Sequence, residues 1–198
     1  MTGDLTVNGI TRPVIVDFEY TGTAVDTYKD DAMSFSPVRL NHAVLFVADL
    51  DRAERFYRNV FGMEVIAREP RANAAFLRLP RSGNHHDLGL FGIGADSGPK
   101  QRGIGLYHLA WQVDTIDELA AARDALIAAG ASTGQSSHGA TKSLYGADPD
   151  GNEFEVMWML PREAWGAYES AAPIDHLDLA AELARWSGVS TAGAADLL

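Results

Sequence analysis

Hydrophobic and polar positions alternate along LNHAVLFV (40–47), a stretch rich in β-branched and aromatic residues that predicts a β-strand. After it, the apolar spacing changes to three or four residues, which predicts a helix. The apolar positions on one face of this helix are Ala53, Phe56, Tyr57 and Val60. Asp49 or Asp51 can cap its start, and Glu54 completes a capping box in the second case. Gly62 suits its end.

Three short strands with turn residues between them are predicted next: MEVIARE (63–69), AAFLRLP (74–80) and HHDLGLFGIG (85–94). The first half of the chain therefore has the order strand, helix, strand, strand, strand.

The same order recurs in the second half. YHLAWQV (107–113) predicts a strand, and Thr115 with Glu118 forms a capping box for the helix over 116–130, which ends at Gly130. Further strands are predicted near residue 131, over 142–145 and at NEFEVMWM (152–159). An offset of 66 residues superposes His42 on His108 and both helix starts on each other. We predict an α+β fold of two βαβββ modules, about 38–95 and 104–160, that form an open barrel.

Two segments flank this domain of residues 38–163. Residues 1–37 are expected to form an N-terminal arm in which PVIVDFEY (13–20) could be a strand. Residues 164–198 form an Ala- and Leu-rich tail that could hold a helix packed on the body or on a second subunit, and this tail carries no visible chemistry.

The amino-acid composition limits the classes of partner and of chemical site that the chain can have. The chain has 198 residues, 16 Lys and Arg against 27 Asp and Glu, and a net charge of −11, which argues against nucleic acid and membrane surfaces as partners. No apolar run is long enough to span a bilayer and no leader is recognisable, so we expect a cytoplasmic protein. Cysteine is absent, which excludes disulfides, thiolate metal sites and a cysteine nucleophile. Any metal must therefore be bound by His and carboxylate groups.

His42 and His108 occupy equivalent positions in the two modules. In the strand over 152–159, Glu153, Glu155 and the methionines share one face, and the apolar residues share the other. A lone strand histidine is usually a packed or rim residue, and alternating glutamates are by default a solvated face. The repeat pairs the two histidines, however, which chance seldom does. Two imidazoles and one carboxylate suit a divalent ion such as Fe(II) or Mn(II).

Several segments resemble the vicinal oxygen chelate superfamily and, within it, the type I extradiol (catechol 2,3-) dioxygenases. The likeness covers about residues 39–163 and lies in LNHAVLFVADLDRAERFYRNVFGMEV, HHDLGLF, GLYHLAWQV and SLYGADPDGNEFEVMW. The DPDGN turn (148–152) is common across the superfamily and identifies the fold.

The resemblance implies a metal bound by His42, His108 and Glu155, with Fe(II) expected and Mn(II) the alternative. It implies catalytic roles for His86, His138 and Tyr145, which would handle protons and hold substrate oxygens. Asp87 favours His86 over His85 as the residue that faces the metal. The implied reaction inserts both atoms of O2 into a catechol.

The repeat also separates oxygenase from lyase. The counterpart of Glu155 in the first module is Gly89, where glyoxalase-type relatives typically supply a carboxylate. A glycine cannot act as a side-chain ligand, although Asp87 could partly replace the missing group. A three-ligand site with open positions therefore favours an oxygenase.

Two other classes stay open: a metal-dependent lyase, isomerase or thiol transferase of the same superfamily, and a drug-binding protein of the bleomycin-resistance type. A homodimer or larger homo-oligomer is expected, because one pair of modules carries an unexplained arm and tail.

Overall fold

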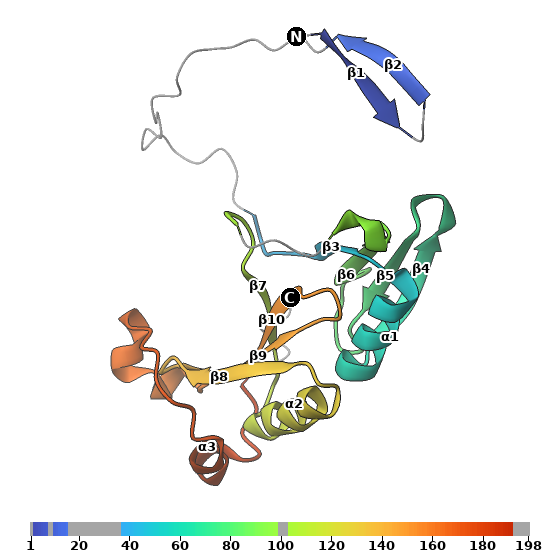
Figure 1. The fold of residues 1–198 in the computed structure, drawn as a ribbon. Coiled ribbons are helices and arrows are strands. Elements are labelled where there is room, and N and C mark those ends of the chain that lie inside the picture. The colour runs from blue at the N-terminus through green and yellow to red at the C-terminus, as the bar shows by residue number, and fades with distance from the viewer. Residues whose placement is uncertain (1, 8–9, 16–36, 99–102, 192–198) are drawn as a thin grey trace, which may run out of the picture. The chain divides into compact units, whose positions relative to one another are not determined.

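The computed structural model describes residues 2–7, 10–15, 37–98 and 103–191 of the chain (Figure 1). It divides into two units, residues 1–40 and 41–198. The first unit contains β1 (Thr2–Val7) and β2 (Ile10–Ile15), which pair antiparallel with Thr2 opposite Ile15. The strand expected over 13–20 is therefore the end of β2, and its residues 16–20 lie outside the described part. β1 was not among the strands predicted from the sequence.

The second unit opens with a four-stranded sheet and one helix, which we call module 1. Its elements are β3 (Ala43–Val47), α1 (Leu50–Phe61), β4 (Glu64–Glu69), β5 (Ala74–Arg78) and β6 (Leu88–Gly92). The strand order is β3-β6-β5-β4, with β3 parallel to β6 and the other pairs antiparallel. Two short 3-10 helices, Pro70–Ala72 and Ala95–Ser97, lie in its connections.

Module 2 repeats this plan. It comprises β7 (His108–Gln112), α2 (Ile116–Ala128), β8 (Ser132–Ser137), β9 (Thr141–Ala147) and β10 (Glu153–Met159). The strand order is β7-β10-β9-β8, with β7 parallel to β10. The βαβββ repeat predicted from the sequence is confirmed. Within the described residues the two sheets are not joined by strand pairing, so they do not close into a barrel.

The capping contacts at the start of α1 decide between the two expected N-cap residues and correct the role expected for Glu54. Asp49 is the N-cap of α1, because its carboxylate accepts a hydrogen bond from the Arg52 N–H at 2.9 Å. Glu54 is therefore not part of a capping box; it is buried and forms ion pairs with Arg58 and Arg68. Gly62 ends the helix with a φ of 65°, in the left-handed region that glycine adopts without strain.

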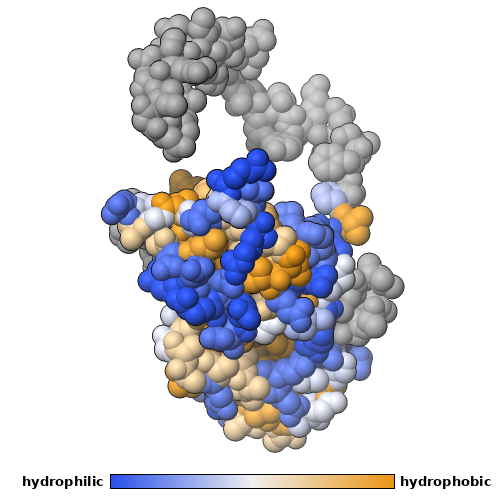
Figure 2. Space-filling model, turned by 90° about the vertical axis from the view of Figure 1, so that its right-hand side faces the viewer, coloured by the Kyte–Doolittle hydropathy of each residue, from blue (hydrophilic) through white to orange (hydrophobic). Residues whose placement is uncertain are grey.

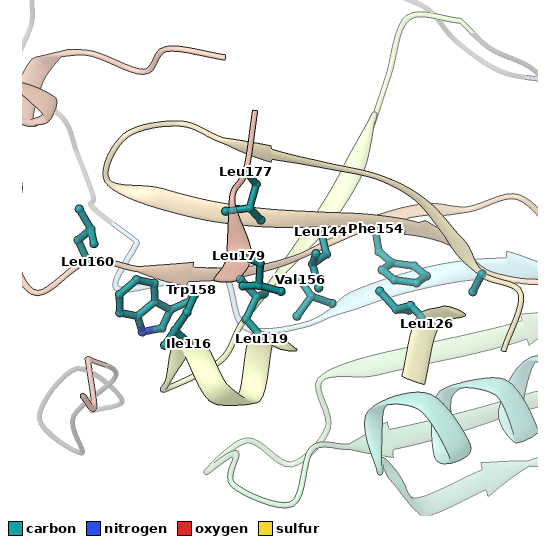
Figure 3. Close-up of a cluster of buried hydrophobic side chains, with 11 residues drawn as sticks. Ile116, Leu119, Leu126, Leu144, Phe154, Val156, Trp158, Leu160, Leu177 and Leu179 are labelled. Atoms are coloured by element: carbon teal, nitrogen blue, oxygen red, sulfur yellow. The ribbon is translucent and has the colours of Figure 1, made fainter. Parts of the chain in front are cut away.

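The alternation along β10 places its apolar side chains in the core of module 2. Phe154, Val156 and Trp158 are buried against α2 (Figure 3), whereas the Glu and Met residues between them are half-buried on the other face. Aromatic contacts continue this core toward module 1, since the Phe56 and Phe61 rings of α1 both contact the Phe154 ring.

The tail packs on module 2. Two 3-10 helices, Arg162–Ala164 and Gly166–Ser170, lead to α3 (Leu179–Trp186). Leu177 and Leu179 are buried in the core of module 2, so this part of the tail packs on the body. No helix among the described residues is both long and apolar enough to cross a membrane. Figure 2 shows one side of the molecule, where hydrophilic and hydrophobic residues are intermixed.

Candidate metal centre

Module 1 contributes a cluster of imidazole rings beside the start of β3. The His42 and His86 ring centroids are 4.4 Å apart, and His86 also packs edge-on against Phe76 at 5.1 Å. His86, and not His85, is therefore the histidine that lies against His42. Desolvation lowers the pKa of His86 below its ordinary value, and electrostatic interaction with the neighbouring His42 and His85 rings lowers it further. A neutral imidazole at this position can accept a proton.

The face of β3 that carries His42 is open. Val44 and Phe46, which share this face by strand alternation, are 51% and 68% exposed, whereas Leu45 and Val47 are buried. This face points away from the core of module 1, because the apolar side chains of α1 cover the opposite face of the sheet.

Module 2 brings together two of the three expected ligands. His108 begins β7 and Glu155 lies on the adjacent strand β10, and the distance from His108 Nε2 to Glu155 Oε2 is 3.1 Å. The Nδ1 atom of His108 is buried and has no hydrogen-bond partner in the described part of the chain. These side chains are largely shielded from solvent, with 26% and 12% exposed.

The donor chemistry of this pair fits a divalent metal. Two ligands in neighbouring positions on one ion, with bonds of about 2.1 Å, lie roughly 3 Å apart. His108 and Glu155 already have that spacing. Across residues 37–98 and 103–191, no three His, Asp or Glu side chains form a group that could hold a metal. His42 and His86 are thus a second cluster, separate from the pair.

Beside the pair lies a hydrogen-bonded triangle of side chains. The Tyr145 hydroxyl is 2.8 Å from His138 Nε2, the Ser136 hydroxyl is 2.9 Å from the same nitrogen, and the two hydroxyls are 3.1 Å apart. The β9–β10 register sets Tyr145 opposite Glu155, and its ring centroid is 5.9 Å from that of His108. His138 is part-buried, although the Ser- and Gly-rich sequence around it favours exposure.

Asp87 and Gly89, the two module 1 positions that could have carried a fourth ligand, have structural roles. The Asp87 carboxylate accepts hydrogen bonds from the Leu79 N–H, the Ser82 hydroxyl and the Asn84 amide. Gly89 lies where a Cβ would be 3.3 Å from a Val44 methyl and 3.5 Å from the Phe76 ring. A side chain at 89 would therefore press on the aromatic face beside His86.

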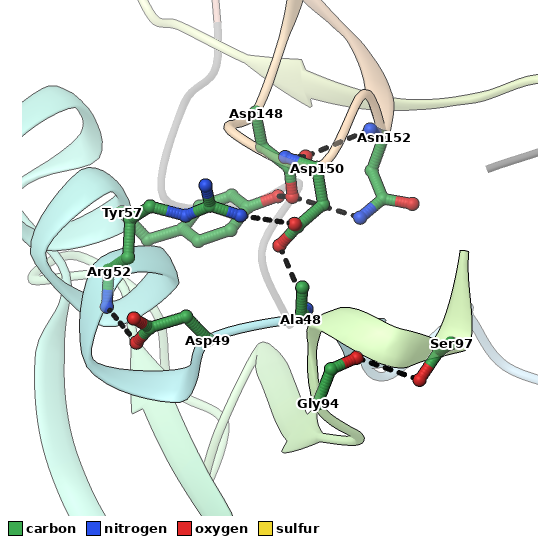
Figure 4. Close-up of polar contacts among 9 residues, drawn as sticks. All are labelled: Ala48, Asp49, Arg52, Tyr57, Gly94, Ser97, Asp148, Asp150 and Asn152. Atoms are coloured by element: carbon green, nitrogen blue, oxygen red, sulfur yellow. Dashed lines mark hydrogen bonds and ion pairs between the residues drawn. The ribbon is translucent and has the colours of Figure 1, made fainter. Parts of the chain in front are cut away.

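The turn before β10 is anchored on module 1 (Figure 4). Asp148 accepts hydrogen bonds from the Asp150 and Asn152 N–H groups, which closes the turn, and from the Tyr57 hydroxyl of α1 at 3.0 Å. Asp150 pairs with Arg52 and accepts from the Ala48 N–H at 3.2 Å. Burial and the negative charge of Asp148 raise the pKa of Tyr57, so its hydroxyl remains a donor. These contacts therefore fix the turn that leads into β10, the strand that carries Glu155.

Sequence reasoning missed two groups of the site. Ser136 lies in a run of small polar residues, and nothing in that run distinguishes it from its neighbours. The second group is the Pro173 carbonyl, which is 2.8 Å from His138 Nδ1. A backbone oxygen in the tail leaves no signature in a sequence, so the tail was expected to carry no chemistry.

Comparison with known proteins identifies the family. A family model described as the Glyoxalase/Bleomycin resistance protein/Dioxygenase superfamily matches residues 39–156. The chain is 30% identical to a catechol-2,3-dioxygenase of Bacillus subtilis over 131 residues, 64% of this chain and 43% of that protein. It is 29% identical to metapyrocatechase 2 of Cupriavidus necator over 69% of this chain and 42% of that protein. The chain thus spans less than half the length of these two relatives.

Solved structures share the fold. A glyoxylase/bleomycin resistance protein/dioxygenase domain from Frankia sp. EAN1pec aligns with a TM-score of 0.54 and 25% identity, over 63% of this chain and 94% of that one. A fosfomycin resistance protein from Listeria monocytogenes aligns with a TM-score of 0.52 and 20% identity, over 65% and 99% of the two chains. The second likeness bears on the fold alone.

Proposed function

Because the chain belongs to the glyoxalase/bleomycin resistance protein/dioxygenase superfamily, we propose that it is an extradiol dioxygenase that cleaves a catechol with O2. The observation that carries this proposal is the His108–Glu155 pair, with Tyr145 and His138 beside it. Relatives named catechol-2,3-dioxygenase and biphenyl-2,3-diol 1,2-dioxygenase 3, at 30% and 33% identity, support the same chemistry.

In this proposal His108 and Glu155 hold one divalent metal, Fe(II) or Mn(II), and His42, which is not grouped with them among the described residues, is the third ligand. The metal would supply Lewis-acid activation of a catechol hydroxyl and a common binding point for ring and O2. His86, whose ring lies against that of His42, accepts a proton and later returns it. Tyr145 and His138 hold a substrate oxygen through the hydrogen-bonded triangle.

A metal-dependent lyase or isomerase is the main competing function. It would be favoured by a fourth carboxylate ligand from module 1, but Gly89 has no side chain and the Asp87 carboxylate already accepts three hydrogen bonds. Oxygen consumption with a panel of catechols separates the two functions, because only the dioxygenase consumes O2 as it forms a yellow ring-fission product.

Two alanine variants test the assigned roles. We expect His108→Ala to lose the metal, and His86→Ala to retain it while ring cleavage falls by at least 100-fold, a typical contribution of general acid–base catalysis. Metal content after anaerobic Fe(II) loading and turnover in air are the two measurements. His176→Ala, which alters an exposed histidine of the tail, is the control. Ring cleavage retained in both variants would contradict the scheme.

We propose further that the protein is a homodimer or larger homo-oligomer. The exposed Val44 and Phe46 side chains beside His42 support this, since adjacent apolar residues on one open strand face suit burial by a partner. Sedimentation of Phe46→Glu should show a shift toward monomer. A mixture of His42→Ala and His108→Ala chains then recovers metal binding if two chains share one centre, and does not if one chain supplies all three ligands.

A further inference from the structure

The C-terminal segment 171–191, which we call the strap, is bound along module 2 at several points. Asp175 and Ser137 exchange backbone hydrogen bonds, both at 2.9 Å, so the strap is paired to the end of β8. At the far end, Asp117 at the start of α2 accepts hydrogen bonds from the Ser187 hydroxyl and the Gly188 N–H. The strap is therefore part of the folded module.

A buried ion pair ties the strap to the turn that carries His138. The Lys142 ammonium lies 3.1 Å from the Glu182 carboxylate of α3, and its side chain is 7% exposed. The same ammonium donates to the Ser137 hydroxyl at 2.8 Å and to the Gly139 carbonyl at 3.1 Å. The residues on either side of His138 are thus fixed to the strap through one cation.

The strap also determines where the His138 ring carries its proton. His138 Nδ1 lies 2.8 Å from the Pro173 carbonyl oxygen. A carbonyl can only accept a hydrogen bond, so Nδ1 must carry the hydrogen. A neutral imidazole has a single N–H, and the Nε2 atom is then left with its lone pair.

That lone pair orients the two hydroxyls around it. Either Tyr145 donates to Nε2 while Ser136 donates to Tyr145, or Ser136 donates to Nε2 while Tyr145 donates to Ser136. In both arrangements the Tyr145 proton stays inside the triangle. The oxygen of Tyr145, whose ring lies 5.9 Å from the His108 ring and whose backbone is opposite Glu155, therefore offers a lone pair to a ligand. In the other tautomer, His138 would donate to Tyr145, whose proton would point outward.

We propose that the Pro173 carbonyl is a positioning group that fixes His138 in the Nδ1–H tautomer and so makes Tyr145 a hydrogen-bond acceptor for the substrate. The specificity that follows, which rests on the proposed dioxygenase function, is for a catechol that still carries a hydroxyl hydrogen at the Tyr145 side. A catechol methylated on that oxygen has no hydrogen to donate.

Nitrogen-15 NMR of the metal-free full chain, labelled at its histidines, tests the tautomer directly. His138→Gln assigns the His138 resonances by their loss. We expect Nδ1 to show the shift of a protonated nitrogen and Nε2 that of a bare one, at a pH where the ring is neutral. An Nε2–H tautomer overturns the proposal. Because this measurement needs neither metal nor catechol, a failure of the dioxygenase function leaves it intact.

The contribution of the strap is tested by replacing the buried ion pair with apolar residues. A Lys142→Met/Glu182→Met double variant removes both charges together, which avoids leaving one buried alone. We expect the folded protein to show both His138 tautomers, and catechol binding to weaken about tenfold relative to binding of 2-methoxyphenol. Arg162→Met/Glu169→Met, at an exposed ion pair, is the matched control. A single Nδ1–H tautomer in the folded double variant would show that the Lys142–Glu182 pair does not set it; if that variant does not fold, the wild-type tautomer still decides the proposal.

Discussion

The two modules repeat one fold but hold their functional residues in different ways. In module 1, His42 is exposed, its Nδ1 faces the neighbouring Asn41, and its other ring contact is His86. In module 2, Glu155 and Tyr145 lie on paired strands, and Tyr145 joins His138 in a closed hydrogen-bonded set. The two copies of the fold therefore differ: in module 2 the functional side chains are held by strand pairing and hydrogen bonds, whereas in module 1 His42 is exposed to solvent. Module 2 carries two of the three proposed ligands.

The largest effect is expected at the proposed metal ligands of module 2. Glu155→Gln removes the charged oxygen that lies 3.1 Å from His108, so metal affinity should fall by at least 100-fold and ring cleavage with it. Titration of the metal-free protein with Mn(II) measures this. Glu153→Gln, two residues away on the same face of β10, is the control and should keep the wild-type affinity. Equal losses in both variants would remove the distinction between the two carboxylates.

A smaller effect is expected when an added methyl group disturbs the packing of each module, with a larger loss of stability in module 2 than in module 1. A Cβ at Gly146 of module 2 would lie 2.5 Å from the Phe154 ring and 3.0 Å from the Ala131 carbonyl, so Gly146→Ala should lower the free energy of unfolding by about 2 kcal/mol. Gly89→Ala in module 1 meets only the movable Val44 and Phe76 side chains and should cost less than about 1 kcal/mol.

Urea denaturation compares these two variants, with Gly83→Ala, where a Cβ would have no neighbour within 4 Å, as the control. A larger loss for Gly89→Ala than for Gly146→Ala would reverse the comparison.

The last prediction concerns the link between the modules. Tyr57→Phe removes the hydroxyl that donates to Asp148, which should cost about 1 kcal/mol of unfolding free energy at neutral pH. The pKa of Tyr57 is raised in the folded state, so its contribution is complete below the unfolded tyrosine pKa of about 10 and is lost as the pH rises above it.

Urea midpoints between pH 7 and about 10.5 follow this contribution. The difference between wild type and Tyr57→Phe should shrink at the alkaline end, while Tyr168→Phe, at an exposed tyrosine, should match the wild type throughout. A constant difference would mean that the Tyr57 hydroxyl is not the titrating group.

What the sequence could predict was mainly local. Alternation along β10 correctly assigned Phe154 to the core and Glu155 to the other face, because strand geometry repeats every two residues. The repeat predicted the shared plan of the modules, and Thr115 and Gly62 marked helix ends through their own chemistry. In the N-terminal unit, Asn8-Gly9 between Val7 and Ile10 is a hairpin signal that could have indicated β1.

The rest depended on long-range contacts. Glu54 has the right spacing for a capping box, yet its partner Arg68 lies on β4 and cannot be deduced from helix periodicity. The open face of β3 depends on which side of the sheet α1 covers. The Pro173 carbonyl reaches His138 across 35 residues through a backbone atom that every residue possesses. The assignment of the three metal ligands and of His86 stays a prediction.

The anchored turn at Asp148 also has a kinetic consequence. Its hydrogen bond to Tyr57 joins residues 91 positions apart in the sequence, and the Arg52–Asp150 pair joins residues 98 positions apart. The turn before β10 is therefore held by α1, a helix far from it in the sequence. Local opening of β10 would have to break these links as well. Amide hydrogens around Glu155 should therefore exchange with solvent only as fast as the whole domain unfolds, whereas those at the start of β3 should exchange through local fraying.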